Sequence, residues 1–110
     1  MPYDIEIEEK INTVITGWPD ITSKKMFGGV GIMLHGNMLV GAYKEFLILR
    51  LSPEGCSEVM GIPFSKPFDI TGRPMKGFIF ITPNGFDMDA DLEYWVQKTL
   101  EYNEETYGKN

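Results

Sequence analysis

The residues of this chain that could act as nucleophiles or metal ligands are few and widely separated. His35 is the only histidine and Cys56 the only cysteine. His35 lies in a turn signal at residues 35–37, where we expect a solvated side chain. Cys56 lies near the start of a short predicted helix, where thiolates are stabilised, but Glu54 and Glu58 oppose thiolate formation. We therefore predict a structural thiol and no catalytic residue.

Two further patterns begin like ligand-binding motifs and do not complete them. Asp87, Asp89 and Asp91 alternate as in a calcium loop, but the central glycine and the closing glutamate are missing at the required spacing. Residues 28–31 are glycine-rich, yet they lack the Gly-Lys-Ser/Thr ending of a phosphate loop and do not open a helix. We predict no metal site and no cofactor.

Charge is distributed unevenly along the chain. The net charge is −6, so the domain as a whole repels phosphate and we do not expect direct DNA binding. Residues 23–50 nevertheless carry four basic residues against one acidic residue. No stretch interleaves aromatic and basic residues as single-strand-binding surfaces do. The middle of the chain is therefore where an anion or an acidic partner would be bound.

The composition is that of an ordinary globular protein, with 43% hydrophobic and 24% charged residues. A length of 110 residues fits a single domain spanning 1–110. A single cysteine fits a reducing cytoplasm, and the sequence has neither a signal-peptide pattern nor an apolar run long enough for a bilayer. We predict a cytoplasmic domain with no membrane partner.

The first half of the chain is predicted to form a helix followed by four strands. Apolar residues at helical spacing indicate a helix over residues 4–16, capped by Asp4. The strands are expected over residues 23–27, 30–34, 38–43 and 46–51. Their connections are too short for parallel crossovers, so the strands form an antiparallel meander.

The second half is predicted to return two helices to this sheet. Ser52 caps a short helix that ends near Met60. An ordered loop follows, with Phe64 and Phe68 in the core, and then a strand over residues 77–82. The last helix starts at Asp89 or Asp91, and a frayed tail begins at Glu104. This order predicts an α+β fold of two layers, an antiparallel sheet covered on one face by helices.

Two short signatures connect these elements to a known family. The first is Lys24-Lys25-Met26-Phe27-Gly28-Gly29, in which the glycines let the backbone bend between two strands. The second is Gly72-Arg73-Pro74-Met75, which leads into the last strand. Followed by a helix carrying Trp95, these segments resemble the N-terminal domain of the TfoX/Sxy family of bacterial competence regulators, over residues 23–102. The structural signature comprises Phe27, Gly28, Gly29, Pro74 and Trp95.

The resemblance implies a non-enzymatic regulatory or protein-interaction domain. In that family a C-terminal helical domain commonly follows, and the full proteins are transcriptional co-regulators. This chain ends after the first domain, so we expect a stand-alone domain that acts through contacts with another protein. Lys24, Lys25 and Arg73 are the expected partner-binding residues. The alternative for these three residues is structural: the lysines protect a sheet edge, and the arginine satisfies loop carbonyls or pairs with an acid.

Two other classes of function stay open on the sequence. An enzyme needs a pocket in which polar groups converge, and the candidates are Lys24, Lys25, Tyr43, Arg50, Cys56 and Arg73. An uncovered apolar face holding Met26, Met33 and Met38 favours a module that binds a small molecule or a peptide. The same face would also serve a homodimer.

Overall fold

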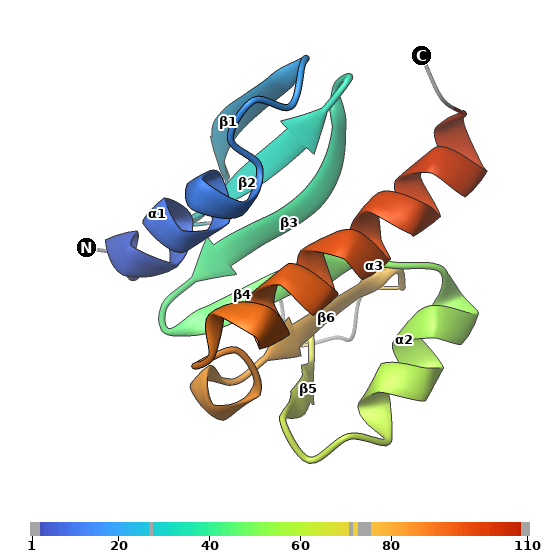
Figure 1. Cartoon of the computed structure of the whole chain (residues 1–110). Helices are drawn as coiled ribbons and strands as arrows, with labels where there is room; N and C mark the ends of the chain where they lie inside the picture. Colours follow the sequence, from blue (N-terminus) through green and yellow to red (C-terminus); the bar gives the residue numbers. More distant parts are fainter. Residues whose placement is uncertain (1–2, 27, 71, 73–75, 109–110) are drawn as a thin grey trace.

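The computed structural model describes residues 3–26, 28–70, 72 and 76–108. This part of the chain forms three helices and six strands, which follow the predicted order except for one additional strand, β5 (Figure 1). They are α1 (Ile5–Val14), β1 (Ile21–Met26), β2 (Gly29–Leu34), β3 (Asn37–Tyr43), β4 (Phe46–Arg50), α2 (Pro53–Met60), β5 (Ser65–Pro67), β6 (Phe78–Ile81) and α3 (Asp89–Tyr107), with a 3₁₀ turn, η1 (Pro83–Gly85), before α3.

The strands form one antiparallel sheet in the order β1-β2-β3-β4-β6-β5. The helices lie together on one face of this sheet, where α1 packs on β3 and α3, α3 on β3 and β4, and α2 on β5 and β6 (Figure 1). The predicted α+β architecture of two layers is therefore confirmed. The sheet has two edges, β1 on one side and β5 on the other.

The core lies between the sheet and the helices. Because side chains alternate across a strand, Leu47 and Leu49 of β4 point toward the helices, together with Ile79 and Ile81 of β6, and all are buried. Trp95 on α3 completes this core as expected, and its indole Nε1 donates a hydrogen bond of 2.8 Å to the carbonyl of Gly85 in η1. This bond fixes the start of α3 against the end of β6.

Local capping follows the sequence. The Asp4 side chain accepts a hydrogen bond from the backbone amide of Glu6, and the Ser52 hydroxyl accepts one from Gly55. Both bonds satisfy amides that have no partner within the first turn of their helix. The two predicted helix starts are thus confirmed to within a residue.

Three expectations for the second half were wrong. Residues 65–67 form the edge strand β5 rather than a loop, although the run is too short to show a strand periodicity. Phe64, expected in the core, is 38% exposed. Residues 104–107 continue α3 instead of fraying, because Tyr102 and Tyr107 pack edge to face with ring centroids 6.5 Å apart and Asn103 is buried.

The two glycines of the first signature make the turn between β1 and β2. Gly28 has a φ of 81°, a conformation that side chains disfavour. Gly29 opens β2 so close to β3 that a Cβ atom there would collide with the carbonyl oxygen of Ala42. The predicted break between two strands is confirmed, while Phe27 itself lies outside the described residues.

A second glycine constraint surrounds Arg50 at the end of β4. The guanidinium Nη1 donates to the carbonyls of Gly77 and Leu51, at 3.0 and 3.3 Å. Its Cζ lies 4.9 Å from the Phe78 ring centroid and 5.3 Å from that of Tyr102. Gly77 has a φ of 86°, and a Cβ there would collide with Nη1. Arg50 therefore joins β4, β6 and α3 only while residue 77 has no side chain.

We expect Gly77→Ala to lower the free energy of unfolding much more than Gly36→Ala. Gly36 also has positive φ, 81°, but no atom lies within 4 Å of its Cβ position, so alanine adds only backbone strain of about 1 kcal/mol. Gly77→Ala should cost about 2 kcal/mol more, because it also displaces Arg50 from two hydrogen bonds worth about 1 kcal/mol each. Urea denaturation of both variants measures the difference, and equal losses would refute this role of Gly77.

Candidate functional site

The face of the sheet opposite the helices, called the open face below, is covered by no helix among the described residues. The strand register assigns every strand's contribution to it. The side chains on the open face come from β1 (Thr22, Lys24, Met26), β2 (Met33), β3 (Met38, Tyr43), β4 (Phe46, Ile48, Arg50), β5 (Lys66) and β6 (Phe78, Phe80).

The half of the open face over β1, β2 and β3, called the methionine half below, consists of methionine side chains that lie over two glycines. Gly31 and Gly41 are paired across β2 and β3, so the backbone is bare between them. The side chains of Met26 and Met33 lie over Gly31, and that of Met38 lies over Gly41. All three methionines are half-buried. Flexible thioether side chains on a bare backbone form a surface that can adapt to different partners.

The half of the open face over β4, β6 and β5 is aromatic and already covered in part. Phe68, which follows β5, folds over this half, with its ring centroid 4.9 Å from that of Phe80. Phe68, Phe80 and Ile48 are buried there as a second, smaller core. Lys66 Nζ lies 4.5 Å from the ring centroid of Phe46 at its rim. The methionine half is therefore the more accessible part of the open face.

The fold brings aromatic and basic side chains together that the sequence keeps apart. Lys66 lies over the ring of Phe46, twenty positions earlier in the sequence, and Arg50 lies over the ring of Phe78. No single stretch of the sequence interleaves these aromatic and basic residues, because the neighbours belong to different strands. The signal that could have found this arrangement is that β4 and β6 are apolar on both faces, which places apolar side chains on the open face as well as in the core.

Charge separates between the two layers. The helices α1, α2 and α3 contain eleven acidic residues and two lysines. The six strands contain no acidic residue and four basic ones, Lys24, Lys25, Arg50 and Lys66. The acidic charge that dominates the composition is thus concentrated on the helical layer, and the sheet is basic.

Two of the three residues predicted to bind a partner, Lys24 and Lys25, lie on β1 at the edge of the sheet. Lys24 and Lys25 are both exposed. Lys24 pairs with Gly31 and projects on the open face, whereas Lys25 pairs with Val30 and projects on the helical side. Adjacent strand residues alternate in this way, so the two lysines do not form one patch. Arg73 and Pro74 lie outside the described residues.

Of the candidates for catalysis, the described structure brings only Arg50 and Cys56 near each other. Lys24 and Lys25 lie on β1 at one edge of the sheet, Tyr43 ends β3, and Cys56 lies on α2 near the opposite edge. Burial raises the pKa of the Cys56 thiol, and the nearby Arg50 opposes this only in part. A thiol that stays protonated is a poor nucleophile.

The remaining chemistry-bearing groups also form no reactive cluster. His35 lies in the turn between β2 and β3 as predicted, with its Nδ1 3.4 Å from Oδ2 of Asp20. In the described part of the chain, no three His, Cys, Asp or Glu side chains are grouped to hold a metal ion. No helix there is both long and apolar enough to cross a membrane.

The fold and the open face define a small domain of two layers, with an acidic helical layer and a basic, methionine-rich sheet face. The family model of the TfoX N-terminal domain matches residues 13–102, and the chain therefore belongs to the TfoX N-terminal domain family. This confirms the resemblance drawn from the two signatures. The family is not a known enzyme family. No curated protein matches the chain.

We expect Cys56 to react with iodoacetamide more slowly at neutral pH than the thiol of a short unstructured peptide. The raised pKa leaves less thiolate, so the rate should keep rising with pH after the peptide's rate has levelled off. Cys56 is the only cysteine, so mass spectrometry of the intact chain measures its rate directly. A rate that levels off at lower pH than the peptide's would show an activated thiol and contradict this assignment.

Proposed function

We propose that this chain is a non-enzymatic regulatory domain that binds an acidic segment of a partner protein on the methionine half of its open face. The observation that carries the proposal is the separation of charge between the layers, with no acidic residue in any strand and eleven in the helices. An acidic segment is repelled by the helical layer and attracted to the sheet, so the charge distribution selects the face.

The methionine half supplies the apolar contact that such a segment needs. Lys24 lies beside it on the open face, and Met26, Met33 and Met38 form its surface. Long-range charge gives orientation and a faster encounter, while the buried apolar area gives most of the affinity. A partner segment with acidic and apolar side chains in alternation matches both features.

The partner class is a protein rather than a nucleic acid. A net charge of −6 opposes a long polyanion, which extends beyond the basic face and meets the acidic layer. A short acidic protein segment stays within the face. In the TfoX/Sxy context the corresponding role is a cytoplasmic co-regulator of transcription that contacts another regulator, and we propose the same role for this chain.

Affinity capture from host lysate tests this with two variants of equal charge. Lys24→Glu places an acid on the open face, and Lys10→Glu makes the same change on the exposed side of α1. We expect the unmodified chain and Lys10→Glu to retain the same protein and Lys24→Glu to lose at least about nine-tenths of it. Both variants should melt at the temperature of the unmodified chain, since both lysines are exposed.

Three outcomes would contradict the proposal. Retention of the partner by Lys24→Glu would remove the open face from the interaction. Recovery of nucleic acid in place of a protein would show that the partner is a nucleic acid. Recovery of only a second copy of the chain, confirmed by light scattering, would make the open face a homodimer interface.

A further inference from the structure

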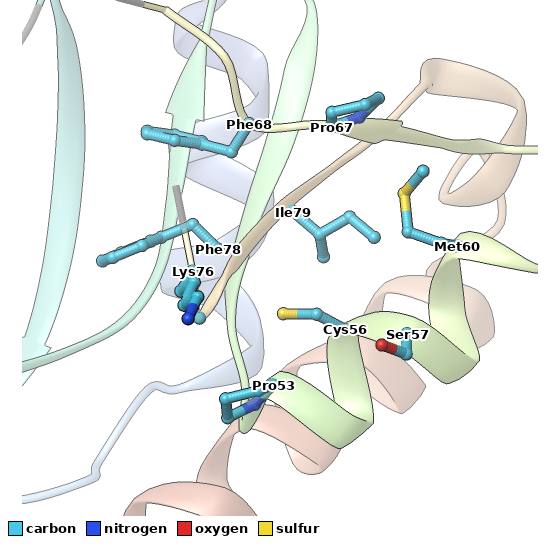
Figure 2. A pocket seen from close by; sticks show the side chains of 10 residues that line it. Pro53, Cys56, Ser57, Met60, Pro67, Phe68, Lys76, Phe78 and Ile79 are labelled. Atoms are coloured by element: carbon cyan, nitrogen blue, oxygen red, sulfur yellow. The ribbon is translucent and has the colours of Figure 1, made fainter. Parts of the chain in front are cut away.

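A pocket of about 450 Å³ lies between α2 and β6, at the end of the sheet away from β1. One wall is a single face of α2, formed by Pro53, Cys56, Ser57 and Met60. This i, i+3, i+4, i+7 spacing runs about 10 Å along the helix. The facing wall is apolar and consists of Pro67, Phe68, Phe78 and Ile79. Figure 2 shows Cys56 pointing from α2 toward the side where Phe78 and Lys76 lie.

The hollow has a cause in the strand pairing. β5 is paired with β6 only as far as Pro67, which faces Ile79. Proline has no amide hydrogen to extend the ladder, and among the described strand pairs β5 follows β6 only to Ile79. Gly77, which Arg50 requires to be glycine, adds no side chain to fill the space. Together, the end of the β5–β6 pairing at Pro67 and the missing side chain at Gly77 contribute to the space between α2 and β6.

The charge in the described lining of the pocket is positive only. Among the described residues, Lys76 is the only charged one in the lining, and it is exposed. The two acids of α2, Glu54 and Glu58, line a different groove that faces α3. An apolar chamber with one cation and no acid fits an anion with an apolar body, and its volume lies in the range of small-molecule sites.

We propose that this pocket binds a medium-chain carboxylate, with the acyl chain lying along α2 and the carboxylate at the Lys76 ammonium. The length of the α2 wall, about 10 Å, accommodates a chain of roughly eight to ten carbons. The proposal goes beyond the binding of a partner on the open face and does not rest on it, because Lys24 and the methionine half lie toward the other edge of the sheet.

Protection of Cys56 from alkylation measures occupancy of this pocket directly, since it is the only cysteine and lies in the pocket wall. The probes are decanoate and decyltrimethylammonium, which have similar chains and opposite charges, each below its micelle concentration. We expect saturating decanoate to slow N-ethylmaleimide labelling about tenfold and the cation to slow it at least fivefold less. Glutathione labelled under the same conditions controls for effects on the reagent.

Two variants of equal charge test the role of Lys76. Lys76→Glu should reverse the preference, so that decyltrimethylammonium protects Cys56 better than decanoate, whereas Lys10→Glu should keep the original preference. We expect decanoate to raise the melting temperature of the unmodified chain but not that of Cys56→Phe, in which the larger side chain fills the pocket. If Cys56→Phe does not fold, the labelling experiments still decide.

The proposal is overturned if decanoate gives no protection, because the pocket then does not take an acyl chain. Equal protection by the two probes, or an unchanged preference in Lys76→Glu, would overturn the assignment of an anion to the Lys76 end. None of these results affects the capture experiment with Lys24→Glu, so the two proposals fail separately.

Discussion

The packing of all three helices on one face of the sheet is the constraint on which the rest of the structure depends. β4 and β6 carry apolar side chains on both faces, and Leu47, Leu49, Ile79 and Ile81 are the ones that point toward the helices. Each such buried side chain stabilises the fold by about 1.5–3 kcal/mol. The opposite side must hide Ile48 and Phe80 without a helix, and Phe68 does so over half of the open face. The methionine half is what remains accessible.

The same arrangement explains how an acidic chain presents a basic surface. Helix positions that point away from the sheet are solvent-exposed and carry most of the acidic residues, while the strands carry only basic ones. Net charge therefore describes the helical layer better than it describes the open face. The strand order also separates the two proposed sites, because Lys24 lies on β1 and the α2 pocket lies beside β6 and β5.

Local signals in the sequence predicted most of the fold. Asp4 and Ser52 predicted the starts of their helices, because capping acts within a few residues. The short connections between the strands required an antiparallel meander. β5 could not be predicted, because three residues ending in Pro67 show no periodicity and their pairing with β6 is non-local. The site was predicted only in part. Met26, Met33 and Met38 were foreseen as one apolar face, but which of Lys24 and Lys25 lies on the open face depends on the register. The pocket beside Cys56 depends on where β5 ends.

The central claim is that the methionine half of the open face is the binding surface, and methyl NMR of the methionine-labelled chain tests it most directly. Met60 and Met88 are 44% and 64% exposed and lie away from that surface, so they are internal controls in the same sample. Titration with the captured partner should shift or broaden the methyl signals of Met26, Met33 and Met38 and leave those of Met60 and Met88 unchanged. Perturbation of Met60 or Met88, with the other three unaffected, would place the partner elsewhere and contradict the account.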